Sequence, residues 1–314
     1  MPQKILIIRP GALGDTLMLM PSIAALRAST ETLFVGRFPG LAYIKPHVRR
    51  AIDYEGQGWH ALFQEDPADY PGFSIPEADP VVAFLSDPEG TVKRNLGHLL
   101  SASRVHIFPP FPAKGTGIHA SLHIARCLEK AGVAIVPELC LSGAIERPLL
   151  GGKPTVPRRA ETVFHPGSGS QAKNHDPVFW LKLVKEWRHH FGQGQALSLL
   201  LGPAEEPMLT YFEKHLFNTS ANIIFSPEPS ELISHLSRAC LYVGHDSGVT
   251  HLAAMLGTPS IALFKGSSVD QWRPLGPRVR VIRGREGDAD LFMRVIRAGQ
   301  GLVESVGKRG THVQ

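Results

Sequence analysis

The sequence predicts an α/β protein made of two Rossmann-like domains, each built on a parallel β-sheet. Short apolar runs typical of buried strands alternate with amphipathic stretches typical of helices, which is the pattern of parallel α/β folds. The alternation stops at residues 151–159, a linker-like stretch rich in Gly and Pro, and then starts again. The 314 residues suit two domains of about 150 residues each. We therefore expect domains over residues 1–155 and 156–288 and a C-terminal segment over 289–314.

The first half opens with a buried strand. The apolar run after Lys4 predicts a strand over residues 4–9, followed by a loop and then a helix over residues 16–28. A further helix is expected over residues 118–131, closed by Gly132 as a C-cap. Later strands are expected at residues 32–36, 81–85 and 104–108. Residues 38–80 are dense in Pro and Gly and predict no element.

The second half repeats the alternation. Strands are expected at residues 161–164, 196–201, 222–225, 241–243 and 260–264. Helices are expected at residues 177–191, 206–216, 230–239, 249–256 and 289–303. Open parallel sheets bind ligands at the carboxyl ends of their strands, so the loops that follow strands are where we expect chemistry.

The composition is that of an ordinary globular protein. It is 43% hydrophobic and 19% charged, with a mean hydropathy of −0.03, which excludes a disordered chain. Cys127, Cys140 and Cys240 form no CxxC pair or zinc spacing and suit a reducing compartment. No apolar run approaches the roughly 20 residues that span a bilayer, and Lys4 leads into a strand rather than a signal peptide. We therefore expect a cytoplasmic protein.

Basic charge is concentrated in the second half. The chain has a net charge of +5; residues 1–157 contain 15 Lys and Arg against 14 Asp and Glu, and residues 158–314 contain 18 against 14. Five arginines fall between Arg273 and Arg285. This charge suits phosphates, nucleic acid or an anionic membrane surface, or is simply a solvated face. No nucleic-acid-binding motif accompanies it, so we expect no nucleic-acid partner.

The first loop that could carry chemistry is residues 10–15. It contains Gly11 and Gly14 but lacks both the full GxGxxG pattern and the Lys-Ser/Thr of a P-loop, so neither common nucleotide motif is present. Asp15 stands where the next helix begins. It is therefore either an N-cap or an exposed carboxylate with a chemical role, and one residue can be both.

A second loop, residues 165–173, favours an anion. Ser168, Gly169 and Ser170 allow backbone N–H groups to approach a phosphate closely, and Lys173 adds positive charge. The alternative is an ordinary flexible loop with a surface lysine.

A third loop, residues 244–248, precedes a helix of small residues. Ser247 and Gly248 place N–H donors at the helix N-terminus, although Asp246 or Ser247 could also be a plain cap. His251, one turn into the helix, is either structural or functional. Near another strand end, Glu205 and Glu206 are either surface charges or contacts to a ribose.

Four segments occur together in a characteristic order and spacing. They are KILIIRPGALGDTLMLMPSIAALR, FHPGSGSQAKNHDPVFWLKL, LLGPAEE and YVGHDSGVTHLAAMLGTPSIALF with the downstream SSVDQWRPLGP. Together they resemble glycosyltransferase family nine, the lipopolysaccharide heptosyltransferases. The resemblance is specific at residues 4–27, 163–181, 199–206 and 241–277 and weak from about 38 to 155. One departure is that residues 174–177, NHDP, stand where an aromatic residue and Pro commonly follow the lysine.

The resemblance implies a GT-B fold, in which two Rossmann-like domains face each other across a cleft. It implies that the C-terminal half holds the sugar donor, the N-terminal half holds the acceptor, and the final helix packs back on the N-terminal domain. It also implies an inverting transfer without a metal ion or other cofactor, from a nucleotide diphosphate sugar, ADP-heptose in the best-known members. The acceptor would be a glycolipid or oligosaccharide of lipopolysaccharide biosynthesis, at the cytoplasmic face of the inner membrane.

Individual residues match the family's motifs. Asp15 matches the general base, in the acceptor-side loop that contains Gly11 and Gly14. Lys173 matches the cation of the diphosphate-binding loop. The other matching donor-side positions are Ser168, Gly169 and Ser170, one of Glu205 and Glu206, and Asp246, Ser247, Gly248 and His251.

Two alternatives stay open. One is a relative that uses another nucleotide sugar or acceptor, because the first half has too little positive charge for a heavily phosphorylated lipid. The other is a non-catalytic module that binds nucleotide sugars, against which the presence of both Asp15 and Lys173 argues. A nicotinamide oxidoreductase is disfavoured because GxGxxG is missing.

Overall fold

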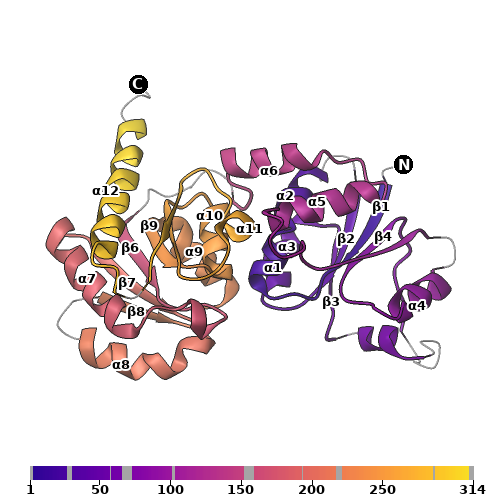
Figure 1. The fold of residues 1–314 in the computed structure, drawn as a ribbon, viewed down its shortest axis with the longest axis horizontal. Helices are drawn as coiled ribbons and strands as arrows, with labels where there is room; N and C mark the ends of the chain where they lie inside the picture. Colours follow the sequence, from indigo (N-terminus) through magenta and orange to yellow (C-terminus); the bar gives the residue numbers. More distant parts are fainter. Residues whose placement is uncertain are drawn as a thin grey trace. The chain divides into compact units, whose positions relative to one another are not determined.

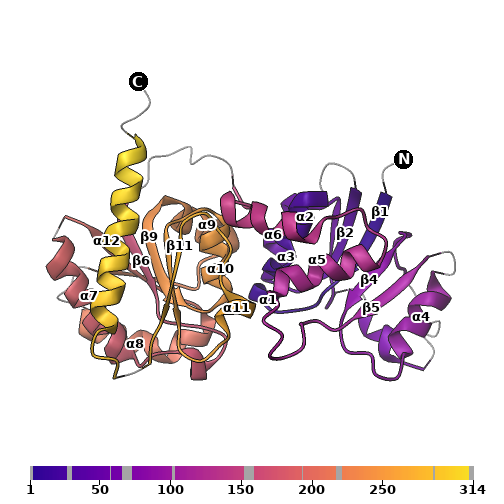
Figure 2. The ribbon, with the colours of Figure 1, turned by 45° about the horizontal axis from the view of Figure 1, so that its top comes forward.

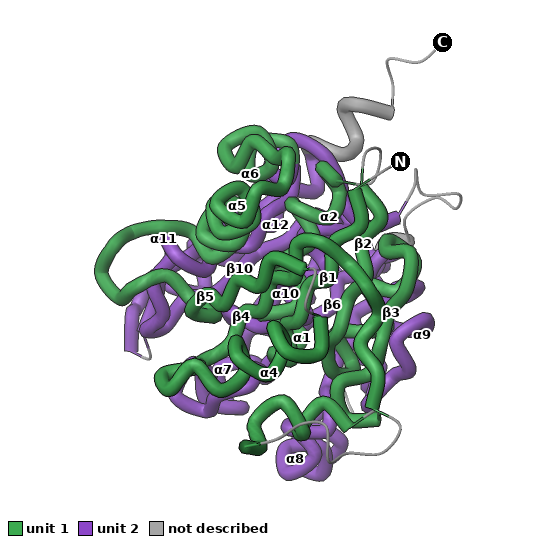
Figure 3. The backbone as a smooth tube through the Cα atoms, turned by 90° about the vertical axis from the view of Figure 1, so that its right-hand side faces the viewer, with its two compact units in different colours: residues 1–143 green, residues 144–314 purple. Residues whose placement is uncertain are grey.

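The chain forms two compact units, residues 1–143 and 144–314 (Figures 1 and 3). The computed structural model describes residues 3–26, 30–56, 58–65, 73–100, 103–151, 159–192, 194–216, 221–285 and 287–310. The units divide inside α6 (Pro137–Glu146), before the boundary expected at residue 155. The N–H groups of Leu149 and Leu150 donate to the carbonyl of Met255, which ties these residues to the second unit. Most of the predicted linker, residues 152–158, lies outside the described residues.

The first unit contains a five-stranded parallel sheet in the order β3-β2-β1-β4-β5. Its strands are β1 (Gln3–Ile8), β2 (Thr30–Gly36), β3 (Arg50–Asp53), β4 (Val81–Phe84) and β5 (Val105–Phe108). Side chains of a strand alternate between the two faces of a sheet. Leu6 and Ile8 of β1 therefore share one core with Leu96, whereas Ile5 and Ile7 are equally buried on the other face. The expected parallel α/β architecture is confirmed.

The helices of the first unit cover both faces of this sheet. They are α1 (Leu13–Leu17), α2 (Met20–Leu26), α3 (Gly40–Ile44), α4 (Thr91–Leu99) and α5 (Ala120–Lys130). The long helix predicted over residues 16–28 is instead the pair α1 and α2, because Pro21 has no N–H to donate to Leu17. α2 and α5 pack side by side (Figures 1 and 2).

The second unit contains a six-stranded parallel sheet in the order β11-β10-β9-β6-β7-β8. Its strands are β6 (Arg159–His165), β7 (Ala196–Leu201), β8 (Ala221–Phe225), β9 (Ala239–His245), β10 (Ser260–Phe264) and β11 (Val279–Arg283). Its helices are α7 (Pro177–Phe191), α8 (Glu206–Leu216), α9 (Pro229–Arg238), α10 (Gly248–Met255), α11 (Val269–Trp272) and α12 (Leu291–Gly310). The predicted bounds of α7, β7, α8 and β10 are confirmed.

The final helix, α12, packs within the second unit. It contacts α7, β9 and β10 (Figure 2). Its residues Leu291, Val295 and Ile296 are buried in the same apolar core as Phe164 and Trp187. Its apolar face therefore covers the sheet of its own unit, and the expected packing of the C-terminal segment on the first domain stays a prediction. No helix in the described part of the chain is long and apolar enough to cross a membrane.

Both sheets have a point where the strand order reverses. In the first unit β1 lies between β2 and β4, and in the second unit β6 lies between β7 and β9. Loops at the carboxyl ends of the strands on either side of such a point form the ligand sites of open parallel sheets. The loops after β1, β6, β7 and β9 hold the residues that the sequence singled out.

Candidate active site

Asp15 lies in the first turn of α1, at its third residue. The N-cap is Ala12, which has no side-chain acceptor, so Asp15 itself is not the cap that we considered. Its Oδ2 instead accepts a hydrogen bond from the N–H of Ala12 (3.1 Å), which satisfies one of the free donors of the helix start. The side chain is partly exposed, so its carboxylate stays reachable.

The glycines of this loop permit close packing around Asp15. A Cβ at Gly11 would lie 2.7 Å from the Cβ of Asp15 and 3.2 Å from its Oδ2, so a larger residue would displace the carboxylate. Gly14 is part of the first turn of α1, where its carbonyl accepts from the N–H of Met18 (3.2 Å).

Arg9, at the end of β1, is a buried cation beside Asp15. Its Nε donates to the backbone carbonyl of Asp15 (2.9 Å) and its Nη1 to the carbonyl of Pro110 (2.8 Å). The guanidinium carbon lies 5.4 Å from the ring centres of both Phe84 and Phe111. Burial lowers the pKa of Arg9 to about 10, and the nearby charge of Asp15 opposes that shift. Sequence reasoning missed this residue, although a charge that ends an apolar strand was a usable signal.

In the second unit, one ion pair joins the two loops predicted to bind an anion. Lys173 Nζ lies 2.8 Å from Oδ2 of Asp246, and Asp246 is only 4% exposed. The other oxygen of Asp246 lies 3.8 Å from Nε2 of His251, which is also buried. The structure therefore brings Lys173, Asp246 and His251 together, from the carboxyl ends of β6 and β9.

Ser168 organises the loop after β6. Its hydroxyl lies 2.9 Å from the carbonyl of Ser170 and 2.6 Å from Oδ1 of Asn174, and it accepts from the N–H of Ser170 (3.3 Å). Ser168 is buried, whereas Gly169 and Ser170 are exposed. The side chain of Ser168 thus holds the loop in shape, and the exposed backbone that follows it is available to a ligand.

The residues that depart from the family pattern after Lys173 have local structural partners. The ring of His175 stacks on those of Phe179 and His245, with centroids 4.5 and 5.1 Å away. Asp176 is the N-cap of α7 and accepts from the N–H of Val178 (2.8 Å).

Ser247 is the N-cap of α10, and Gly248 is the first residue of that helix. The hydroxyl of Ser247 accepts from the N–H of Thr250 (3.3 Å), which supports the plain-cap alternative for its side chain. The remaining N–H groups of the first turn have no acceptor within the helix and give this end a partial positive charge. The backbone of this turn, rather than the Ser247 side chain, is suited to an anion.

Of the two glutamates after β7, only Glu205 faces the loop of β6. It is buried, and its Oε2 accepts from the N–H of Gly202 (2.8 Å). A Cβ at Gly167 would collide with the Glu205 carboxyl group, so glycine is needed there. Burial raises the pKa of Glu205, opposed by the hydrogen bond from Gly202. Glu206 is exposed and begins α8.

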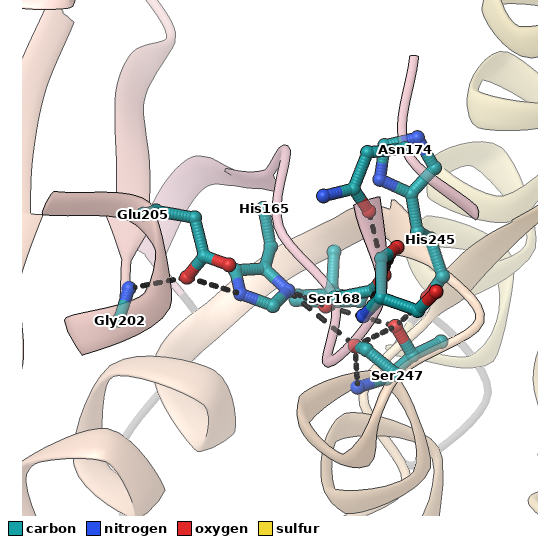
Figure 4. A network of polar contacts seen from close by, with 10 residues as sticks. His165, Ser168, Asn174, Gly202, Glu205, His245 and Ser247 are labelled. Carbon is teal, nitrogen blue, oxygen red and sulfur yellow. Dashed lines mark hydrogen bonds and ion pairs between the residues drawn. The ribbon is translucent and has the colours of Figure 1, made fainter. Parts of the chain in front are cut away.

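His165, the last residue of β6, is buried beside Glu205 of the loop after β7 (Figure 4). Its Nδ1 lies 3.0 Å from the hydroxyl of Tyr242 and its Nε2 lies 3.9 Å from Oε2 of Glu205. Burial lowers the pKa of His165 to about 4, so the ring is neutral at neutral pH and its contact with Glu205 is not an ion pair. No group of three or more His, Cys, Asp or Glu suited to a metal ion occurs among the residues that the structure describes.

The chain is similar to known glycosyltransferases. Residues 148–298 match the model of glycosyltransferase family 9 (heptosyltransferase), whereas no curated protein sequence matches. The family 9 glycosyl transferase from Veillonella parvula is 15% identical, covers 96% of this chain and 97% of its own, and has a TM-score of 0.69. Heptosyltransferase WaaC of E. coli, solved with ADP, is 15% identical over 96% of this chain and 99% of its own (TM-score 0.66). ADP-heptose lps heptosyltransferase II of E. coli is 18% identical over 97% and 100% (TM-score 0.65). The fold is therefore GT-B, as predicted.

Proposed function

We propose that this chain is a glycosyltransferase that moves heptose from ADP-heptose to a hydroxyl of a glycolipid acceptor of the lipopolysaccharide core, because residues 148–298 match the model of glycosyltransferase family 9 (heptosyltransferase). We propose further that the transfer inverts the anomeric centre and uses no metal ion. The observation that carries the proposal is the Lys173–Asp246 pair, which joins two anion-favouring loops at the reversal point of the second sheet. Heptosyltransferase WaaC of E. coli has been solved with ADP and with ADP-2-deoxy-2-fluoro heptose, which favours this donor.

The second unit would bind the donor. An ammonium group has three N–H donors, and one of those on Lys173 is directed to Asp246, so the others remain for the diphosphate. As the sugar–phosphate bond breaks, negative charge grows on the departing diphosphate. Lys173 and the first turn of α10 would stabilise that charge from fixed positions. Of the two glutamates, Glu205 would accept a hydrogen bond from the nucleoside ribose, because it faces the loop of β6 whereas Glu206 is exposed to solvent.

The first unit would bind the acceptor and supply the base. The carboxylate of Asp15 takes the proton of the acceptor hydroxyl while that oxygen attacks the anomeric carbon opposite the diphosphate. A weak base suffices when it is well placed, because the hydroxyl becomes acidic as the new C–O bond forms. A lipid-linked acceptor would place the enzyme at the cytoplasmic face of the inner membrane.

Asp15→Asn tests this role directly. The Asn amide oxygen can still accept from the N–H of Ala12, but the amide cannot take up a proton. We expect turnover of ADP-heptose with a lipopolysaccharide core acceptor to fall by about 10²–10⁴, with thermal stability little changed. The assay is the release of ADP, followed beside a thermal melt.

The matched control is Asp79→Asn. Asp79 precedes β4, at the opposite edge of the sheet, and accepts from the N–H of Arg104 (2.8 Å). The Asp79→Asn variant should retain full turnover. Near-normal turnover by Asp15→Asn would show that the carboxylate only supports the helix start. If the enzyme turns over only with a different nucleotide sugar, the proposed donor is wrong, but the proposed role of Asp15 as the base still stands.

A further inference from the structure

Arg9 is a buried cation that no carboxylate directly binds among the described residues. It is 1% exposed, and its hydrogen bonds go to two backbone carbonyls. Its third nitrogen, Nη2, is enclosed and has no hydrogen-bond partner in the part of the chain that the structure describes. Burying a charge in this way costs free energy. An uncharged side chain would therefore be more favourable if the role of this residue were purely structural.

The hydrogen bonds of Arg9 fix the turn that contains Asp15. Nε binds the backbone carbonyl of Asp15, while Nη1 binds Pro110 in the loop after β5. The planar guanidinium thus ties the start of α1 to a second loop at the same edge of the sheet. Phe84 and Phe111 lie against it at equal distances and limit its movement. With the bond from Ala12 to its Oδ2, Asp15 is held at both its backbone and its side chain.

Arg9 also places a buried positive charge near Asp15. Of the charged groups that raise the pKa of Arg9, Asp15 has the largest effect. Charges interact more strongly at buried sites than in water, and Arg9 is not exposed to solvent that would screen it.

We propose that Arg9 is a positioning residue for Asp15, which fixes the first turn of α1 and with it the place of the Asp15 side chain. The proposal rests on the role of Asp15 as the base. Arg9 itself touches neither the sugar nor the proton in transfer, so its effect should be transmitted only through Asp15.

A double-mutant cycle tests this dependence. The enzymes are the unmodified chain, Arg9→Lys, Asp15→Asn and the double variant, each assayed for ADP release from ADP-heptose. Lys keeps the charge but cannot donate to both carbonyls as a planar fork does. We expect Arg9→Lys to lower kcat by roughly 10- to 100-fold. The donor KM should stay within about twofold, because the proposed donor loops lie in the second unit. In the Asp15→Asn background the same change should lower kcat by less than about threefold.

The control is Arg104→Lys, which alters an exposed arginine paired with Asp79 and should leave kcat unchanged. Phe111→Leu is a second variant that removes one ring from Arg9. It should lower kcat by about 3- to 10-fold, an effect that should vanish without Asp15. Thermal melts establish that each variant is folded.

Three outcomes would overturn the proposal. Unchanged kcat in Arg9→Lys, or an equal loss from Arg9→Lys with and without Asp15, would assign Arg9 to stability alone. Near-normal turnover of Asp15→Asn by itself would overturn the role of Asp15 and, with it, that of Arg9. The first two outcomes leave the proposed function intact, so the two failures are distinguishable.

Discussion

His165 makes the stability of the second unit sensitive to acid. Burial lowers its pKa from the ordinary 6.5 to about 4. Between these values the unfolded chain binds a proton that the folded chain does not, so stability is lost as the pH falls through this window. His245 acts in the same direction, because burial and the neighbouring His175 lower its pKa. Glu205 acts in the opposite direction, since its raised pKa removes stability as the pH rises through its folded value.

We expect His165→Gln to reduce this acid sensitivity. The free energy of unfolding of the unmodified chain should fall between pH 6.5 and pH 5 by about 1–2 kcal/mol more than that of the variant, since one proton contributes about 1.4 kcal/mol per pH unit. Urea unfolding at several pH values measures both slopes. His190→Gln, at an exposed position on α7, should keep the slope of the unmodified chain. Parallel slopes for His165→Gln and the unmodified chain would mean that His165 does not titrate in this window.

At the residue scale, sequence located the loops better than the contacts within them. The pairing of Lys173 with Asp246 joins two motifs that strand order alone brings near each other. The choice between Glu205 and Glu206 depends on which side chain turns inward at the end of a short helical turn, which composition does not specify. The position of Asp15 three residues into α1 depends on Ala12 taking the N-cap position, although Ala is a poor cap.

At the scale of single elements, a glycine of helix α12 allows that helix to pack closely against α7. Gly299 is buried, and a Cβ there would collide with the ring of Trp187 on α7. Gly301, on the same helix, is exposed, and no atom of the described residues lies within 4 Å of such a Cβ. The two positions therefore form a matched pair in which only one side chain meets a neighbour.

We expect opposite effects of the same substitution at these two positions. Gly299→Ala should lower the free energy of unfolding by about 1–3 kcal/mol, because the added methyl group overpacks the contact between α12 and α7. Gly301→Ala should raise it by about 0.5–1 kcal/mol through helix propensity alone. Urea unfolding of the two variants and the unmodified chain measures both changes in the free energy of unfolding. Equal effects would show that α12 does not pack on α7 in solution.

Two strands that the sequence did not predict lie at sheet edges and lack an apolar pattern. β11, with the sequence VRVIR, contains two arginines and lies at the edge of its sheet, so it lacks the continuous apolar run of a central strand. β3 is a four-residue edge strand within residues 38–80, where Pro and Gly interrupt every pattern. Central strands such as β1 and β10 are buried throughout most of their length, which is why their apolar runs predicted them.

At the scale of the whole molecule, the predicted division into two sheets is confirmed, and the candidate residues fall into two sets. Asp15, Gly11 and Gly14 belong to the first unit, and every donor-side candidate belongs to the second. The end of the first unit was not predictable from composition. Leu149 and Leu150 join the second unit through backbone bonds to Met255, a contact between residues about a hundred positions apart.

This division predicts that donor binding and turnover respond to different variants. Lys173→Ala should weaken ADP binding by about 10- to 100-fold, because a charge-assisted hydrogen bond contributes roughly 1.5–3 kcal/mol. Adenosine, which has no phosphate, should bind equally well to the variant and to the unmodified chain. Asp15→Asn should bind ADP as the unmodified chain does, since its carboxylate lies in the other unit. Calorimetric titration with ADP, UDP, GDP and adenosine measures these affinities and identifies the nucleotide. Lys185→Ala, at an exposed position on α7, is the matched control and should leave ADP binding unchanged. Equal ADP affinity in Lys173→Ala and the unmodified chain would remove Lys173 from the donor site.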